Sequence, residues 1–186
     1  MTKNYITHYP KPYELIAAAI EYAEEHLDDS TFRHSMRIGV LASGAGDSIG
    51  RGVEAMVVGI LHDVLEDWDP ILLGRKSQMR SWRPSSDVED MLKEMSNLFG
   101  QNIVDTVIVL TRRQGSWFPS GGETYSEYIG RVLESELASV VKCCDIQDHL
   151  AEENAATLLP SLRPRYEIAL DRLHESLDAR WNEVNV

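Results

Sequence analysis

The sequence has only two cysteines in 186 residues, and they are neighbours, Cys143 and Cys144, inside an apolar run. Adjacent cysteines do not form the spaced framework of a disulfide-rich extracellular domain, so a reducing cytoplasm fits the chain best. Residues 1–14 lack the apolar core of a secretory signal peptide. No apolar stretch approaches the roughly 20 residues that are needed to span a bilayer. We therefore expect a cytoplasmic protein without a membrane partner.

Basic residues are also scarce, with 18 Lys and Arg against 30 Asp and Glu and a formal net charge of −12. Nucleic acid and anionic membranes are bound by basic surfaces, which this composition disfavours. A small phosphorylated molecule needs only a local group of cations. The densest such group is the loop around 75–83, with Arg75, Lys76, Arg80 and Arg83. We expect a small-molecule partner, and the sequence leaves the oligomeric state and the role of this loop open.

Sustained period-2 alternation is missing too, which argues against β-strands. Apolar residues recur at helical spacing instead and predict helices near 12–27, 32–41, 51–66, 86–98, 101–110, 124–132, 136–150 and 168–181. Ser30 or Thr31 is the expected N-cap of the second helix, and Gly44, Gly46 and Gly50 are expected to break the chain before the central one. We predict an all-α bundle of seven or eight helices. It forms one domain over residues 1–186, with its core at 12–150 and C-terminal helices at 155–182.

The central helix ends in a group of ionisable residues, His62-Asp63 followed by Glu66-Asp67. The apolar run 55–61, which is expected to be buried, directly precedes them in the sequence. Buried charges persist only when they are paired or bound to metal. One interpretation is therefore two metal ligands with two carboxylates near the metal's water. The alternative is a solvated acidic last turn, although the helix dipole disfavours acidic residues at that end.

Two further residues are candidates to complete such a site. His34 precedes the apolar run that starts at Met36, and Asp145 lies within the apolar run 140–146. A carboxylate in so apolar a context requires a partner. An ordinary core or surface histidine is the alternative for His34, and a structural role is equally open for Asp145. His149 follows Asp145 by one helical turn.

In this order, the residues resemble the HD-domain metal-dependent phosphohydrolases, and most closely their RelA/SpoT-type branch, which includes small alarmone hydrolases. Residues 61–67, LHDVLED, resemble the HDxxED motif of that branch. Residues 141–145, VKCCD, resemble its VKLAD segment. Residues 110–113 and 122–131, LTRR and GETYSEYIGR, resemble the segment between those motifs. The resemblance spans about residues 12–150.

This resemblance implies a helical HD domain and a divalent metal, usually manganese. By the match, the metal ligands would be His34, His62, Asp63 and Asp145, and Glu66 and Asp67 would hold and activate the metal's water. The implied substrate-binding residues are Lys142, Arg131, Arg112, Arg113, Tyr125, Tyr128 and His149. For the arginines, a solvated loop is the alternative, and for the tyrosines a packed helix face.

Two departures from the family pattern concern the substrate. Residues 27–33 are shorter and more acidic than the basic segment that alarmone hydrolases carry before the first ligand. His149 replaces an asparagine that is usual in the family. The expected activity is hydrolysis of a phosphorylated or pyrophosphorylated nucleotide, with removal of the 3′ pyrophosphate of (p)ppGpp as its sharpest version. The alternatives are another nucleotide phosphatase, for a nucleoside mono- or triphosphate, and a non-catalytic nucleotide-sensing HD module.

Overall fold

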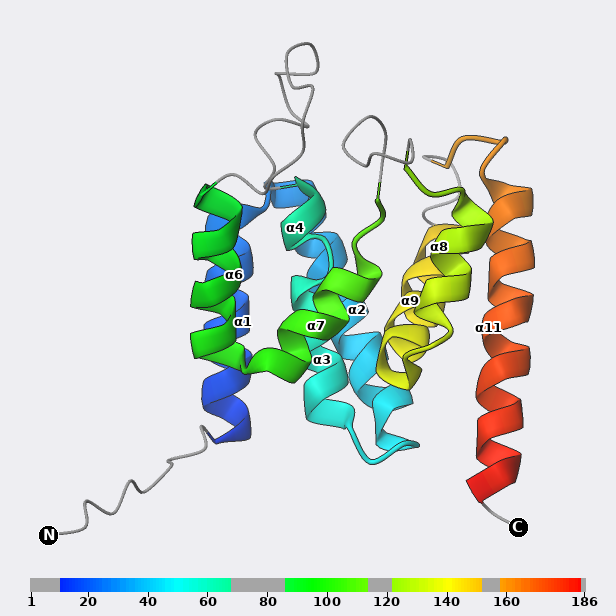
Figure 1. Cartoon of the computed structure of the whole chain (residues 1–186), viewed down its shortest axis with the longest axis horizontal. Coiled ribbons are helices and arrows are strands. Elements are labelled where there is room, and N and C mark those ends of the chain that lie inside the picture. The colour runs from blue at the N-terminus through cyan, green and yellow to red at the C-terminus, as the bar shows by residue number, and fades with distance from the viewer. Residues whose placement is uncertain (1–10, 68–85, 114–121, 152–157, 185–186) are drawn as a thin grey trace, which may run out of the picture.

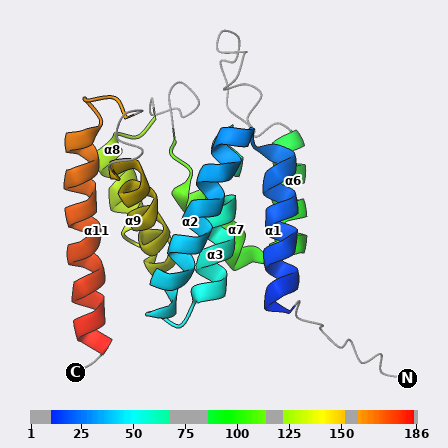
Figure 2. The same ribbon diagram turned by 180° about the vertical axis from the view of Figure 1, so that it is seen from behind.

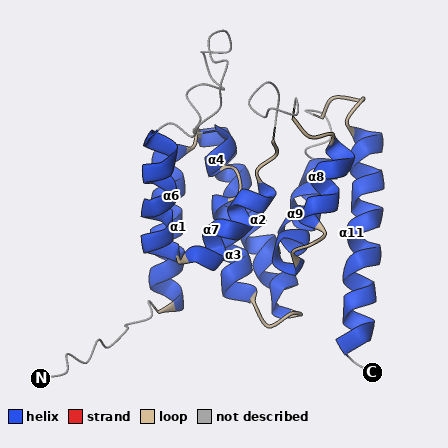
Figure 3. Ribbon diagram, viewed as in Figure 1, coloured by secondary structure: helices blue, strands red, loops and turns tan. Residues whose placement is uncertain are grey.

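The computed structural model describes residues 11–67, 86–113, 122–151 and 158–184, and every regular element among them is a helix (Figure 3). The predicted all-α fold is therefore confirmed. The helices are α1 (Pro12–His26), α2 (Asp29–Asp47), α3 (Gly52–Leu61), α4 (Val64–Asp67), α6 (Ser86–Phe99), α7 (Gln101–Leu110), α8 (Tyr125–Val132), α9 (Glu136–Leu150) and α11 (Arg163–Val184). The basic cluster at 75–83 and the start of the predicted segment 155–182 lie outside the described residues. Within the described part, no helix is long and apolar enough to cross a bilayer.

Helices α3 and α9 lie in the middle of the bundle, and most of their residues are buried. A helix that is apolar on nearly all sides needs neighbours all round. Helix α2 packs on both of them. Helices α1 and α6 lie at one end of the bundle and α11 lies at the other, against α9 and α8 (Figures 1 and 2). Both cysteines are buried free thiols on α9.

Glycines set the close contact between α2 and α3. A Cβ atom on Gly59 would lie 2.9 Å from the backbone of Gly39, and one on Gly46 would lie 2.5 Å from the Cβ of Ala55. The prediction that Gly44 and Gly46 break the chain was wrong, because α2 continues to Asp47 and uses Gly46 as a packing position. The turn instead falls at Gly50, whose φ of 69° suits glycine.

Side-chain caps fix the beginnings of two helices that carry site residues. The Asp28 carboxylate accepts hydrogen bonds from the N–H groups of Ser30, at 2.7 Å, and Thr31, at 3.2 Å. Asp28 is therefore the N-cap of α2, and the prediction of Ser30 or Thr31 was wrong. At α8, Thr124 and Glu127 form a capping box, in which each side chain accepts a hydrogen bond from the other residue's backbone N–H.

The segment predicted as one central helix over 51–66 is divided. Helix α3 ends at Leu61, His62 and Asp63 form a turn, and α4 begins at Val64. Neighbouring side chains diverge along a continuous helix and can converge at its end. The turn therefore gives His62 and Asp63 the helix-end position that joint ligation of one cation requires.

The last helix, predicted over 168–181, begins earlier, at Arg163. Leu173 is fully buried, and α11 packs against α9. Ala169 is also buried, and Tyr166 and Leu170 pack against the core. Ile168 is 63% exposed, so it lies outside this buried apolar face.

Candidate metal centre

Four predicted ligands meet between three parts of the fold. His34 comes from α2, His62 and Asp63 from the α3–α4 turn, and Asp145 from α9. The Asp145 Oδ1 atom lies 3.1 Å from His34 Nε2 and 3.8 Å from His62 Nε2. Asp63 Oδ1 lies 3.2 Å from His62 Nε2, and its Oδ2 lies 3.9 Å from His34 Nε2. The fold therefore brings together side chains that are distant in sequence.

Hydrogen bonds determine which nitrogen of each imidazole carries a proton. His62 Nδ1 lies 2.8 Å from the carbonyl oxygen of Gly59, which can only accept, so Nδ1 is the donor. His34 has carboxylates at both ring nitrogens, with Nδ1 3.0 Å from Asp148 and Nε2 3.1 Å from Asp145, so a neutral ring that donates to Asp148 has its lone pair at Nε2. In the neutral rings, both Nε2 atoms then present lone pairs toward Asp63 and Asp145. His62 Nε2 is buried and makes no hydrogen bond with any described residue. Lone pairs that face carboxylates are the arrangement a cation stabilises.

The electrostatics of the cluster favour positive charge within it. Burial acts to lower the pKa of His62, but the carboxylates of Asp63 and Asp145 outweigh it and raise the pKa to about 9. Burial acts to raise the pKa of Asp145, but the Lys142 ammonium and the neighbouring imidazoles of His149, His34 and His62 hold it well below its usual range. Carboxylates that attract protons onto imidazoles attract a divalent cation for the same reason. Binding of a cation would release those protons.

Asp148 and Arg37 are site residues that sequence reasoning missed. Arg37 donates to both carboxylate oxygens of Asp148, at 3.0 and 2.9 Å, and Asp148 accepts from His34. A carboxylate behind a metal-binding histidine fixes the orientation of its ring. The spacing could have revealed both, because Arg37 lies three residues after His34 and Asp148 three residues after Asp145.

Of the two predicted catalytic carboxylates, Glu66 lies near this cluster. Its Oε1 accepts a hydrogen bond of 2.5 Å from the backbone N–H of Arg112. Burial raises the pKa of Glu66, although that hydrogen bond and the charge of Lys142 oppose the shift. A carboxylate with a raised pKa suits general acid–base chemistry near neutral pH. The backbone of Asp67 ends α4, and its side chain lies outside the described atoms.

Two of the residues predicted to bind phosphate, Arg131 and Lys142, already contact other groups of the protein. All five N–H donors of Arg131 have acceptors: both carboxylate oxygens of Glu123 and three carbonyl oxygens at the end of α7. Arg131 thus ties α8 to α7, and we remove it from the expected phosphate partners. Lys142 Nζ lies 2.6 Å from Asp145 Oδ2 and 5.2 Å from the centre of the Tyr128 ring. Its ammonium thus forms an ion pair with a predicted metal ligand, Asp145.

Arg112 is better suited to an anionic ligand. Its Nε is buried without a hydrogen-bond partner, while one terminal nitrogen donates to the Glu123 carbonyl at 3.3 Å. The neighbouring Arg113 is exposed at the edge of the described residues, and its backbone N–H donates to Glu123.

The two tyrosines of α8 differ. The buried Tyr128 hydroxyl donates to the Leu110 carbonyl, which is a packing role. The Tyr125 hydroxyl is buried without a hydrogen-bond partner among the described residues, and its ring centre lies 5.6 Å from the guanidinium of Arg112 and 4.7 Å from that of Arg165. Sequence reasoning missed Arg165, because α11 was considered only for its apolar face. Tyr125 therefore remains the stronger candidate for contact with a ligand.

His149 was expected to contact substrate, and the structure places it at the ligand cluster. Its Nε2 lies 3.3 Å from Asp145 Oδ1. The side chain is 39% exposed, and its ring lies 4.8 Å from the His34 ring and 5.6 Å from the Tyr166 ring of α11. His149 is thus the most exposed of the three histidines that approach Asp145.

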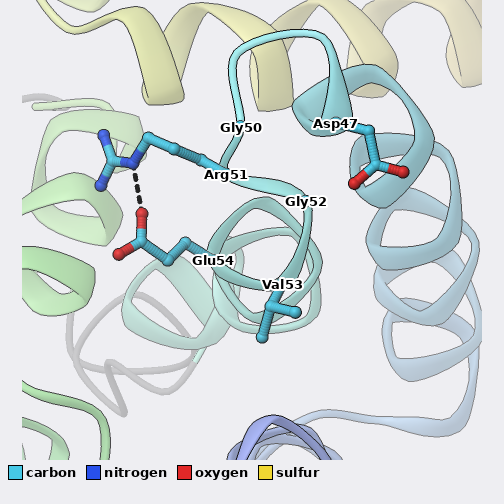
Figure 4. Close-up of a pocket in the computed structure, with 6 residues that line it drawn as sticks. All are labelled: Asp47, Gly50, Arg51, Gly52, Val53 and Glu54. Atoms are coloured by element: carbon cyan, nitrogen blue, oxygen red, sulfur yellow. Dashed lines mark hydrogen bonds and ion pairs between the residues drawn. The ribbon is translucent and has the colours of Figure 1, made fainter.

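An open depression lies elsewhere, at the turn between α2 and α3. It is lined by Asp47 and residues 50–54, and Arg51 donates to the Glu54 carboxylate there (Figure 4). Asp47 is the last residue of α2, about 20 Å along the helix axis from His34. The depression is therefore separate from the ligand cluster.

No known family model matches the chain, and no curated protein matches it significantly. The residues of the centre are consequently assigned from their geometry and from the motif resemblance.

Proposed function

We propose that the protein is a metal-dependent phosphohydrolase that acts on a phosphorylated or pyrophosphorylated nucleotide, as the HD-domain resemblance implies. The observation that best supports this proposal is that Nε2 of His34 and Nε2 of His62 both face the carboxylates of Asp63 and Asp145. Among the described residues, His62 Nε2 is buried without a hydrogen-bond partner. This donor set fits one divalent cation, held by His34, His62, Asp63 and Asp145. Imidazole together with carboxylate suits Mn²⁺, the proposed ion.

When bound, a divalent cation lowers the pKa of a nearby water and stabilises charge that develops on a phosphoryl group. Glu66 is the proposed acceptor of the water's proton, because burial raises its pKa and the N–H of Arg112 fixes one of its oxygens. Asp67 is the second proposed carboxylate. Lys142 keeps Asp145 ionised, and Asp148 keeps Nε2 of His34 available.

Arg112 is the proposed phosphate partner in the described part of the chain. A guanidinium binds phosphate through charge-assisted hydrogen bonds, and Arg112 Nε has no acceptor among the described residues. Arg113 is a second proposed cation, and Tyr125 a proposed neighbour of the ribose or base. The most specific form of this proposal is that the substrate is a pyrophosphorylated nucleotide such as ppGpp.

A second candidate, hydrolysis of a nucleoside monophosphate, is favoured by the contacts that Arg131 and Lys142 already make within the protein. With these two cations committed to protein partners, fewer remain for a substrate with several phosphates. A non-catalytic nucleotide sensor has no use for Glu66 as a proton acceptor.

A nucleotide panel tests these proposals. The protein is incubated with Mn²⁺ and ppGpp, ATP, GTP or nucleoside monophosphates, and pyrophosphate and orthophosphate are measured with and without a chelator. We expect chelator-sensitive pyrophosphate release from ppGpp, loss of activity in His62→Ala, and full activity in His174→Ala, which changes an exposed histidine of α11. Hydrolysis of monophosphates with ppGpp and ATP intact would establish the second candidate. Binding of nucleotide without any product would contradict both.

A further inference from the structure

We propose that His149 is a fifth ligand of the cation and that its imidazole shifts the ion preference of the site from Mn²⁺ toward Co²⁺ and Zn²⁺. The proposal rests on the proposed function in that it requires the metal centre. Among the described residues, two groups of three side chains could each hold a cation. One group is His34, His62 and Asp63, and the other is His34, Asp145 and His149. Within each group, the three ligand atoms lie within 4.8 Å of one another. His34 belongs to both.

The two groups describe one site. Because Nδ1 of His34 is hydrogen-bonded to Asp148, the ring offers a single lone pair, at Nε2, and one lone pair binds one cation. Asp145 Oδ1 joins the groups, since it lies 3.1, 3.3 and 3.8 Å from the Nε2 atoms of His34, His149 and His62. A cation at Asp145 and His34 therefore lies within reach of His149 as well.

The packing holds the His149 ring in place for this role. His149 lies four residues after Asp145 on α9, so both side chains project from the same face. The ring is flanked by His34 at 4.8 Å and by Tyr166 of α11 at 5.6 Å. The His149 side chain is 39% exposed, whereas the Asp145 side chain that it contacts is 4% exposed. The ring can ligate a cation without a change in the helix.

A third imidazole changes the chemistry of the donor set. The proposed set has three nitrogens and two carboxylates, whereas the four-ligand set has two of each. Carboxylate-rich sites suit Mn²⁺, and added imidazole favours ions later in the divalent series such as Co²⁺ and Zn²⁺. An asparagine, which is usual in the family at this position, offers no imidazole nitrogen.

The first test counts imidazoles in the wild-type protein. When Co²⁺ is bound, the ring N–H of each ligating histidine gives a strongly shifted, exchangeable proton resonance. We expect three such resonances, from His34, His62 and His149, and loss of one in His149→Asn. Two resonances in the wild type would overturn the proposal. This count uses the wild-type chain, so the proposal stays testable even if a variant fails to fold.

The second test measures ion affinity by competition with a chromophoric chelator, for Co²⁺ and Mn²⁺ separately. Loss of a residue that merely supports a ligand typically weakens binding by about 10–100-fold. We expect His149→Asn to weaken Co²⁺ binding by at least that factor and Mn²⁺ binding by less, with no change in the exposed-site control His174→Asn. Equal Co²⁺ affinity in wild type and His149→Asn would overturn this proposal alone. A wild-type protein that binds neither ion would instead overturn the metal centre and the proposed function.

Discussion

A single backbone carbonyl, that of Gly59, decides which nitrogen of His62 is available to a cation. It accepts from Nδ1, so the lone pair of the neutral ring is at Nε2, among the carboxylates. The HDxxED motif predicts that His62 and Asp63 act together. It does not predict the tautomer, because the Gly59 carbonyl approaches the ring only once the turn after α3 has formed.

Glu66→Gln separates catalysis from metal binding. Glutamine keeps a side-chain oxygen for the Arg112 N–H but cannot take up a proton. We expect unchanged metal content and a loss of turnover of about 10²–10⁴-fold, the usual contribution of general acid–base catalysis. Steady-state kinetics with Mn²⁺ checks this. Near-normal turnover would remove Glu66 from the mechanism and leave Asp67.

Asp148→Asn tests the support behind His34. The amide can still contact the ring but loses the charge that fixes the His34 tautomer and binds Arg37. We expect metal affinity to fall by about 10–100-fold. Titration with Mn²⁺ measures the change, and Asp178→Asn, at an exposed position of α11, serves as the control. Unchanged affinity in Asp148→Asn would show that the charge of Asp148 does not support metal binding by His34.

At the level of helices, the contact of α2 with α3 sets the distance between His34 and His62. Gly59→Ala would put a methyl group 2.9 Å from the backbone of Gly39, which has no flexible end to move. We expect a loss of about 1–3 kcal/mol in the free energy of unfolding and weaker metal binding. Gly44→Ala is the control, because nothing lies within 4 Å of its added Cβ and α2 should gain about 0.4–1 kcal/mol. Denaturant unfolding of both variants decides the matter, and equal stabilities would contradict this view of the interface.

The ion pair between Glu123 and Arg131, whose guanidinium joins α8 to the end of α7, predicts that the free energy of unfolding depends on pH. Burial acts to raise the pKa of Glu123, but hydrogen bonds from Arg131 and the Arg113 N–H outweigh it and lower the pKa below 4.5. The unfolded chain therefore binds the proton more readily. The stabilisation is complete above the unfolded pKa and is lost as the pH falls through the folded one.

We expect Glu123→Gln to be about 1–2 kcal/mol less stable at pH 7, and the difference to shrink below pH 4.5. Unfolding curves at several pH values check this. A constant difference at all pH values would mean that the charge of Glu123 makes no contribution.

The sequence was enough to predict that the elements are helices. It predicted the residues at which those helices begin and end less accurately. Apolar spacing predicts α1, α7 and α9, and the capping box predicts the start of α8, because these signals are local. From the sequence alone, Gly46 was expected to break the helix. In the structure it lies within α2, where the absence of a side chain allows Ala55 of α3 to pack against it. The meaning of such a glycine depends on a neighbour that the local sequence does not reveal.

At the level of the whole molecule, the bundle joins His34 to residues 111 and 114 positions later, Asp145 and Asp148. The motif order predicted the first of these pairs. It overlooked the second pair, and it did not reveal that the donors of Arg131 are used by the Glu123 carboxylate and by carbonyl oxygens. Packing decides which cations remain for a ligand.

Metal content after purification and incubation with Mn²⁺ tests the central claim most directly. The wild-type chain should hold one divalent cation per molecule by mass spectrometry. Each of His34→Ala, His62→Ala, Asp63→Ala and Asp145→Ala should hold less, because each removes a donor from the cluster. His174→Ala should hold as much as the wild type. Full occupancy in His34→Ala would show that the ligand set is wrong, and a wild-type protein that binds no divalent cation would contradict the metal centre itself.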